Sequence, residues 1–185
     1  LSQWLDLEVV QEVIASKRAV ETLIPATDVA IELGGEDAKI IYFDNGIEQR
    51  MNGTCAGGTG AFIDQMATLL HTDASGLNEL AANATTIYPI ASRCGVFAKT
   101  DVQPLLNEGI PTTDLALSAL HAVARQTIGG LAQGIDIEPP VIFEGGTLAY
   151  NPTLVRVFRE QLNLSDDQVT VSYTHLRAHE TLSDL

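Results

Sequence analysis

The order of apolar and polar positions divides this chain into an early β-rich part and a later helical part. Between residues 29 and 52, β-branched and aromatic residues dominate two runs, DVAIEL and AKIIYFD, which the turn GGED separates. A third run follows Asn45-Gly46, a dipeptide typical of tight hairpins. We therefore expect three antiparallel strands over residues 29–52. Apolar residues at helical spacing between Val9 and Val20 predict a helix before them.

From Thr59 onward the spacing of apolar residues is that of helices. Thr59 would cap the first helix, and GLNELAANA predicts a second. Three later helices are predicted. The first begins after Thr100 and ends at Gly109. The second covers Thr113 to Gly134 and starts with a Thr-Thr-Asp cap, and the third covers Pro152 to Leu162. Before the last of them, PVIFEGG predicts a buried strand that leads into a glycine turn. Helices that follow a sheet of this kind indicate an α/β or α+β fold.

Composition and charge exclude two classes of partner. The chain has 24 acidic and 10 basic residues, a formal net charge of −14, and its basic residues form no stripe that would bind a nucleic-acid backbone. No apolar run approaches the roughly 18 residues that a membrane-spanning helix needs. We therefore expect a cytoplasmic protein with neither a nucleic-acid nor a membrane partner.

The two ends of the chain differ from its middle. The chain begins at Leu1 within a helical pattern, so we expect residues 1–28 to lead in from an N-terminal domain that precedes this sequence. Residues 171–185 follow no periodicity and resemble a translated sequencing-adaptor read, which predicts a non-native or disordered tail. One globular domain, residues 29–170, remains between them.

Two glycine turns follow predicted strands. Gly34 and Gly35 in ELGGEDAK allow two interpretations: a tight hairpin turn alone, or a cradle whose N–H groups bind phosphate, with Asp37 near a phosphate-bound Mg²⁺. Gly145 and Gly146 in EGGTLAYN allow the same choice, since their small size would admit a flat base or a ribose. Two such turns favour a nucleotide site, although neither matches the P-loop or the GxGxxG pattern.

The two cysteines occur in similar settings. Cys55 in NGTCAGGTGAF and Cys94 in SRCGVFAKTD both stand close to glycine and to a predicted helix start. A lone cysteine in a tight turn is usually a small packing residue, whereas a helix N-terminus stabilises a thiolate or an anionic cluster. The C-x₂₋₄-C spacing of zinc sites is absent. A [4Fe-4S] cluster also takes four thiolates, which a two-fold dimer would supply with two from each subunit.

Four segments together resemble one protein family; they are ELGGEDAKI, MNGTCAGGTGAFIDQMA, SRCGVFAKTDVQPLLNEG and FEGGTLAYNPTLV. They are similar to the ATP-dependent activators of 2-hydroxyacyl-CoA dehydratases, a family that includes the ATPase subunits of benzoyl-CoA reductase. The likeness runs from Glu12 to Leu162 and looks closest to the activase portion of large multidomain members. It implies the α/β, ribonuclease H-like fold of acetate kinase, sugar kinases, Hsp70 and actin, of which this chain would contain largely the second of two domains.

The resemblance also implies roles for individual residues. Cys55 and Cys94 would ligate one [4Fe-4S] cluster shared across a homodimer. Asp37 and Glu32, the latter standing where the family has aspartate, would be catalytic and act through Mg²⁺. The residues that would bind ATP are Gly34, Gly35, Glu36, Lys39, Gly145 and Gly146. The family's first phosphate loop has no counterpart in this sequence.

The function that the resemblance implies is ATP-driven donation of one electron to a 2-hydroxyacyl-CoA dehydratase, which would be the partner enzyme. Two alternatives stay open. One is a sugar or carboxylate kinase-like phosphotransferase of the same superfold, which would contain no iron. The other is a degenerate docking module, which would bind neither iron nor nucleotide.

Overall fold

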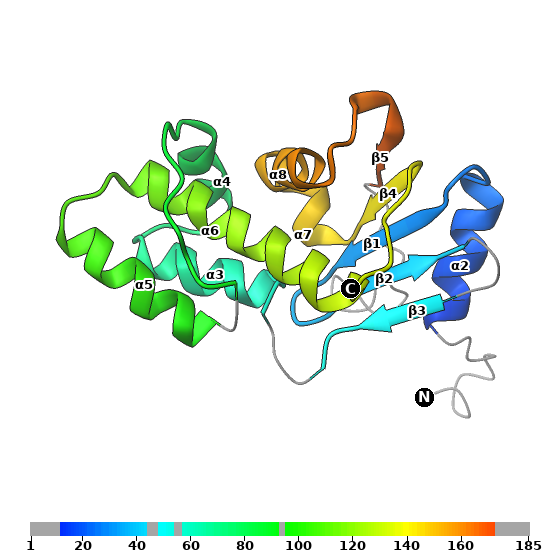
Figure 1. The fold of residues 1–185 in the computed structure, drawn as a ribbon, viewed down its shortest axis with the longest axis horizontal. Helices are drawn as coiled ribbons and strands as arrows, with labels where there is room; N and C mark the ends of the chain where they lie inside the picture. The colour runs from blue at the N-terminus through cyan, green and yellow to red at the C-terminus, as the bar shows by residue number, and fades with distance from the viewer. Residues whose placement is uncertain (1–11, 44–47, 54–56, 93–94, 173–185) are drawn as a thin grey trace, which may run out of the picture.

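The computed structural model describes residues 12–43, 48–53, 57–92 and 95–172 of the chain. A mixed five-stranded sheet forms its centre, with the strands in the order β3-β2-β1-β4-β5 (Figure 1). The strands are β1 (Val29–Leu33), β2 (Ala38–Tyr42), β3 (Glu48–Met51), β4 (Val141–Glu144) and β5 (Val169–Val171). Neighbours among β1, β2 and β3 are antiparallel, whereas β4 is parallel to β1 and to β5. The three predicted antiparallel strands and the later buried strand are confirmed.

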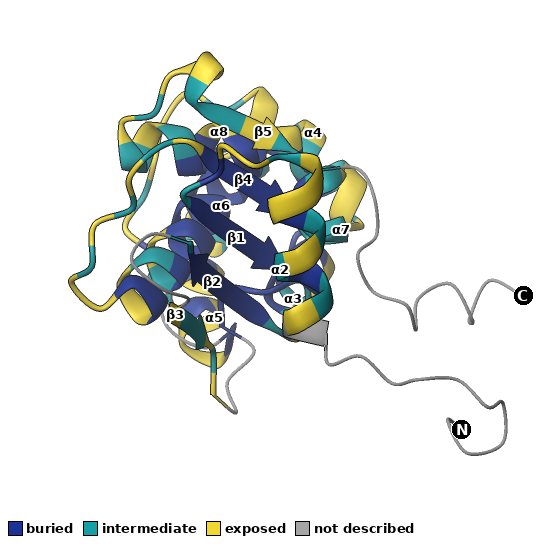
Figure 2. Ribbon diagram, turned by 90° about the vertical axis from the view of Figure 1, so that its right-hand side faces the viewer, coloured by how far each residue is buried: buried dark blue, intermediate teal, exposed yellow. Residues whose placement is uncertain are grey.

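Helices cover both faces of the sheet. Figure 2 shows α2 lying across one face, with α6 and α8 on the other, and Figure 1 shows that α3, α4 and α5 extend the helical layer beyond the sheet. The helices are α2 (Glu12–Leu23), α3 (Gly60–Leu69), α4 (Ala74–Ala82), α5 (Gly95–Asn107), α6 (Thr112–Thr127), α7 (Gly146–Ala149) and α8 (Pro152–Leu162). A π-helical turn η1 (Ile128–Ala132) follows α6, and a 3₁₀ turn η2 (Asp166–Gln168) precedes β5. Among the helices of the described ranges, none is long and apolar enough to cross a membrane.

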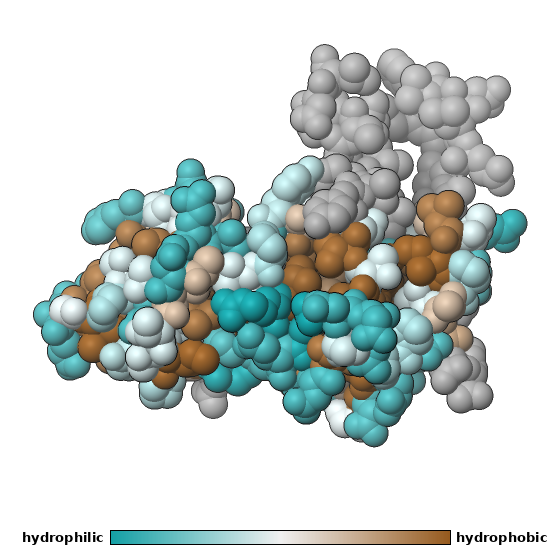
Figure 3. All heavy atoms as spheres, turned by 90° about the horizontal axis from the view of Figure 1, so that it is seen from above, coloured by the Kyte–Doolittle hydropathy of each residue, from teal (hydrophilic) through white to brown (hydrophobic). Residues whose placement is uncertain are grey.

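Alternation along the strands gives the sheet two apolar layers. On the α2 side, Ala30, Ile41 and Ile142 pack with Val20 in a small cluster. The residues next to them along the strands, such as Ile31, Ile40 and Phe143, face the larger core, which contains buried residues of α3, α4, α6 and α8. Seen from above, the outer surface over α8 and the following turn gathers hydrophilic side chains (Figure 3). The core therefore lies between the sheet and the helical layer, and α2 closes the opposite face.

Helix α5 begins earlier than the sequence pattern predicted. Its first residue is Gly95 rather than one after Thr100, although its end at Asn107 is close to the predicted end. Val96 and Phe97, in its first turn, are 68% and 53% exposed. The apolar residues of this turn are consecutive and not spaced by three or four, so they do not form the stripe that reveals a core-facing helix in a sequence.

The longest predicted helix is divided in the structure. Helix α6 ends at Thr127, and the rest of the predicted range continues as the π-helical turn η1. This turn contains Gly129 and Gly130, which stabilise regular α-helical geometry poorly because glycine loses the most conformational freedom on folding. The predicted Pro152 to Leu162 helix is confirmed as α8.

The predicted Thr-Thr-Asp cap of α6 is wrong. Pro111 occupies the N-cap position, and Asp114 lies inside the helix. The Asp114 carboxylate instead accepts hydrogen bonds from the backbone N–H groups of Thr85 and Thr86, at 2.8 and 3.2 Å. An acidic residue early in a helix can thus bind another segment, a choice that sequence spacing does not reveal.

The ends of the chain lie largely outside the description. Residues 1–11 of the predicted lead-in and 173–185 of the predicted tail are not among the described residues. Within the range assigned to the tail, Val171 ends β5, and the Ser172 N–H donates to the Phe143 carbonyl at 2.8 Å. Strand β5 was not predicted, because three residues are too few for alternation to be recognised.

Candidate nucleotide site

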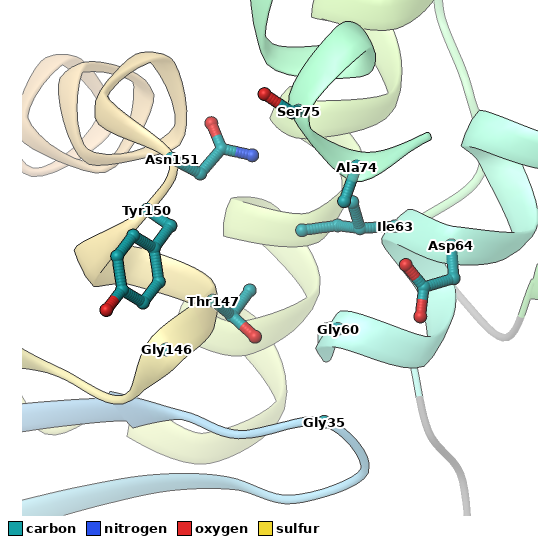
Figure 4. Close-up of a pocket in the computed structure, with 10 residues that line it drawn as sticks. All are labelled: Gly35, Gly60, Ile63, Asp64, Ala74, Ser75, Gly146, Thr147, Tyr150 and Asn151. Carbon is teal, nitrogen blue, oxygen red and sulfur yellow. The ribbon is translucent and has the colours of Figure 1, made fainter. Parts of the chain in front are cut away.

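A cavity of about 560 Å³ lies between the sheet and the helical layer (Figure 4). Its lining consists of Gly35, Gly60, Ile63, Asp64, Ala74, Ser75, Gly146, Thr147, Tyr150 and Asn151. The two predicted glycine turns therefore border one cavity, since Gly35 comes from the β1–β2 turn and Gly146 from the turn after β4. The other walls are the first turns of α3 and α4.

The β1–β2 turn is closed by its own backbone and held by α3. The Gly34 N–H donates to the Asp37 carbonyl at 2.8 Å. The carbonyls of Gly34 and Gly35 accept from the first N–H groups of α3, at 3.0 and 2.7 Å. Because the C=O and N–H of one trans peptide unit point in opposite directions, the N–H groups of Gly35 and Glu36 point away from α3. Consecutive N–H groups in such a turn are suited to bind phosphate oxygens.

The same contact explains how α3 begins. Thr59 occupies the predicted N-cap position, but its side chain makes no capping hydrogen bond. The N–H groups of Gly60 and Ala61 instead bond to the carbonyls of the β1–β2 turn. The first N–H groups of α3, which have no partner within the helix, are thus bonded to carbonyls of the turn beside the cavity.

The second glycine turn depends on glycine at one position. Gly145 has φ 88° and ψ 153°, a conformation that is almost exclusive to glycine. A Cβ atom there would also overlap the carbonyl oxygen of Leu33, the last residue of β1. In the next turn, the Thr147 hydroxyl donates to the Gly34 carbonyl at 3.1 Å. The two glycine turns are therefore in direct contact.

The far wall of the cavity combines apolar and polar groups. Ile63 and Ala74 supply the apolar part, and the exposed ring of Tyr150 lies at the edge (Figure 4). The Asn151 Oδ1 accepts from the Leu154 N–H at 3.0 Å, and its Nδ2 points toward the cavity in Figure 4. The Asp64 carboxylate adds a hydrogen-bond acceptor. A flat base with a hydroxylated sugar suits these walls.

Two further predicted residues lie together on the other face of the sheet. Glu32 on β1 and Lys39 on β2 are register partners, and both are buried. The Lys39 Nζ lies 3.3 Å from the Glu32 Oε2. Neither residue lines the cavity. Of the remaining turn residues, Glu36 is exposed and Asp37 is half-buried.

Glu144 is a buried acid that the sequence analysis did not single out. It is the parallel register partner of Glu32, is 1% exposed, and accepts a hydrogen bond from the Ser16 hydroxyl of α2 at 3.3 Å. Its other oxygen has no hydrogen-bond partner among the described residues. Burial, followed by the nearby charge of Glu32, raises the pKa of Glu144 to about 7. A glutamate that ends an otherwise apolar strand was the available signal.

Cys55 and Cys94 both lie outside the described residues. The helices that follow them, α3 and α5, begin at Gly60 and Gly95. The start of α5 lies against the middle of α3, since a Cβ atom on Gly95 would overlap the side chain of Gln65. In the described ranges, no group of three or more His, Cys, Asp or Glu side chains is arranged to hold a metal ion.

A mixed sheet, its helical layer and two touching glycine turns at one cavity define a domain of the actin-like ATPase class, as predicted. The model of the BadF/BadG/BcrA/BcrD ATPase family matches residues 3–179, and the chain belongs to that family. The predicted relationship to dehydratase activators is thereby confirmed.

Relatives and solved structures agree with this assignment. The 2-hydroxyisocaproyl-CoA dehydratase activator of Clostridioides difficile is 32% identical over 157 residues, which is 83% of this chain and 58% of that protein. The crystal structure of (R)-2-hydroxyglutaryl-CoA dehydratase component A from Acidaminococcus fermentans has a TM-score of 0.79 and 32% identity, covering 89% of this chain and 62% of the other. The Clostridium difficile activator with bound ADPNP also has a TM-score of 0.79, with 28% identity over 95% and 70% of the two chains. The chain thus spans little more than half of the first of these relatives.

Proposed function

We propose that this chain is the nucleotide-binding and cysteine-bearing part of an ATP-driven activator of a 2-hydroxyacyl-CoA dehydratase. The observation that carries the proposal is the meeting of the two glycine turns at one cavity. A bound ADPNP in the similar Clostridium difficile activator supports a nucleotide as the ligand.

Different residues of the cavity would bind the phosphates, the base and the ribose of ATP. The N–H groups of Gly35 and Glu36 would bind the phosphates, with Asp37 beside the Mg²⁺ that neutralises them. The base would lie against Ile63 and the ring of Tyr150, and Asp64 would accept hydrogen bonds from the ribose hydroxyls. Gly34, Gly145 and Gly146 would shape the turns. Glu32 and Lys39 would support the phosphate turn from the opposite face of the sheet, since they form the second register pair from it, next to Leu33 and Ala38.

Cys55 and Cys94 would hold a [4Fe-4S] cluster shared with a second copy of the chain. The contact of the start of α5 with α3 supports this pairing, because each of these helices follows one of the cysteines. Helix N-termini stabilise thiolates by their N–H groups and dipole, so the donor set fits an anionic cluster. When bound, such a cluster supplies one-electron chemistry at low potential. The dehydratase would be the acceptor.

Anaerobic iron and sulfide analysis tests the proposal together with ADP titration of the same sample. We expect ADP binding and about four irons per dimer, since each subunit would contribute two thiolates. Cys55→Ala and Cys94→Ala should each lose the iron while ADP binding remains. A full complement of iron in either variant would contradict the ligand assignment. Absence of ADP binding in the unchanged chain would contradict the nucleotide site.

A further inference from the structure

One carbonyl group joins the β1–β2 turn to both α3 and α7. The Gly34 oxygen accepts hydrogen bonds from the Gly60 N–H (3.0 Å) and from the Thr147 hydroxyl (3.1 Å). A Cβ atom on Gly60 would lie 2.9 Å from the Thr147 Oγ1, so this hydroxyl lies directly beside the start of α3. Figure 4 shows the Thr147 side chain between Gly146 and Gly60. The three elements that border the cavity therefore meet at the Thr147 hydroxyl.

The turn and α7 would contact different parts of a nucleotide. The phosphates would lie at the turn, where Gly35 borders the cavity. The base and the ribose would lie beside Ile63 of α3 and beside Tyr150 and Asn151, which directly follow α7. A nucleotide such as ADP would therefore contact both elements at once, whereas adenosine and pyrophosphate would each contact only one of them.

Thr147 is suited to fix the position of α7 relative to the turn. It is the only residue of α7 with a hydrogen-bonding side chain, because the sequence of this helix is GTLA. Its hydroxyl donates its one hydrogen to the Gly34 carbonyl, so no hydrogen remains for an ionised phosphate oxygen, which can only accept. An effect of Thr147 on the binding of phosphates would consequently act through the turn.

We propose that Thr147 is a positioning residue that holds α7 and the phosphate-binding turn at the separation that a nucleotide spans. The inference rests on the proposed nucleotide site. Two contacts with one ligand reinforce each other when their separation matches the ligand, because the first contact raises the effective concentration for the second. A separation that is fixed before binding also lowers the ordering cost of binding. The Thr147 hydroxyl therefore strengthens the binding of nucleotides but not that of adenosine or pyrophosphate alone.

Titration of the full chain with ADP, adenosine and pyrophosphate tests the proposal, by calorimetry for ADP and by ligand-observed NMR for the two weaker ligands. Thr147→Val keeps the shape of the side chain but lacks the hydroxyl, and we expect it to weaken ADP binding by about fivefold. The affinities for adenosine and for pyrophosphate should each change by less than about twofold. Thr147→Ser, which keeps the hydroxyl, should bind ADP as the unchanged chain does.

Thr153→Val is the matched control. The Thr153 hydroxyl also donates to a carbonyl of another helix, that of Asn78 in α4, at 3.3 Å, but Thr153 does not line the cavity. This variant loses a hydrogen bond of the same kind, and its affinity for ADP should stay within about twofold of that of the unchanged chain. A loss as large as that of Thr147→Val would indicate a general effect of helix packing and would contradict the inference.

The remaining outcomes separate this inference from the nucleotide site. An unchanged chain that does not bind ADP would overturn both. Full ADP affinity in Thr147→Val would overturn this inference alone, as would a loss that Thr147→Ser does not restore. An equal loss for adenosine would also overturn it, because Thr147 would then contact the nucleoside directly. If circular dichroism shows that Thr147→Val does not fold, Thr147→Ala replaces it with the same expected results.

Discussion

The two faces of the sheet use the ends of β1 and β4 in different ways. On the helical side, the turns after these strands touch each other and border an open cavity. On the α2 side, Glu32 and Glu144, which lie in register on the same two strands, are buried beside Lys39. Phosphate binding on the first side would depend on backbone groups, whereas the second side contains buried ionisable side chains.

This difference follows from the alternation of side chains along a strand. Leu33 faces the large core, whereas Glu32, one residue earlier, points to the α2 face. The strands can therefore carry glycine turns at their ends and still keep three ionisable side chains, Glu32, Lys39 and Glu144, buried on the α2 face. On the cavity side, the free energy of unfolding should therefore depend mainly on backbone conformation. On the α2 side, it should depend mainly on pH.

The largest expected effect is on the cavity side. Gly145→Ala should lower the free energy of unfolding by about 4 kcal/mol, because it combines a conformation that only glycine adopts readily with an overlap on the Leu33 carbonyl. Chemical denaturation would measure the loss. Gly109→Ala is the control, since Gly109 also has positive φ (82°) but a Cβ there meets nothing within 4 Å. Equal losses in the two variants would show that the overlap with the Leu33 carbonyl contributes nothing.

The next effect concerns Glu144 on the α2 side. The folded state holds its proton up to a pKa of about 7, above the ordinary value of 4.5, so the folded state binds more protons between these pH values. The free energy of unfolding should therefore fall by about 3 kcal/mol as pH rises from 4.5 to above 7. Glu144→Gln, which cannot ionise, should remove this fall when denaturation is followed across pH.

The control for that experiment is Glu21→Gln, which changes an exposed glutamate paired with Lys17. It should leave the pH dependence in this range as it is in the unchanged chain. An unaltered slope in Glu144→Gln would mean that Glu144 is ionised in the folded protein at neutral pH.

A smaller effect is expected at the polar wall of the cavity. Asp64→Asn should weaken ADP binding by about tenfold, roughly 1.4 kcal/mol, because an amide replaces the carboxylate that would accept from both ribose hydroxyls. Calorimetric titration would measure the loss. The same substitution should hardly change the affinity for 2′,3′-dideoxy-ADP, which lacks both hydroxyls. A similar loss for the two ligands would place the ribose elsewhere.

The smallest effect tests the hydrogen bond between Ser16 of α2 and Glu144. Ser16→Ala removes the hydroxyl that donates to Glu144, a bond that lowers the pKa of this carboxyl and so favours its ionised form. We expect a loss of about 1 kcal/mol above pH 8 and a smaller loss near pH 5, where Glu144 is protonated. Ser165→Ala in the exposed η2 turn should show no such difference between the two pH values. A pH-independent loss in Ser16→Ala would indicate packing alone.

Local patterns predicted much of this architecture. The hairpin of β1 and β2, the buried strand β4 and the helix α8 all have strong short-range signals, namely β-branched runs, Gly-Gly turns and a Pro at the helix start. The start of α5, the division of α6 and strand β5 were missed because exposed apolar residues, a π-helical turn and a three-residue strand leave little periodicity.

The candidate site was predicted in parts. Gly35 and Gly146 were both named from their sequence context, and the structure brings them to one cavity. Asp64, Ser75 and Tyr150 were not, because ordinary residues on helices and loops have no special spacing when they line a pocket. Glu32 and Lys39 were also named from the sequence, and the structure shows them as a buried pair on the α2 face. Their roles at Mg²⁺ and phosphate stay predictions.

The sequence by itself determined which segments become strands, helices and glycine turns, because these depend on residues close together in the chain. It also contained the family's motifs, including both cysteines. Only the tertiary structure decided that Gly145 rests against Leu33, that Glu144 lies beside Glu32, and that Asn52 and Gly60 bond to one turn. Each of these contacts joins residues distant in sequence, and the pairing of β4 with β1 and the packing of α3 on the hairpin create them.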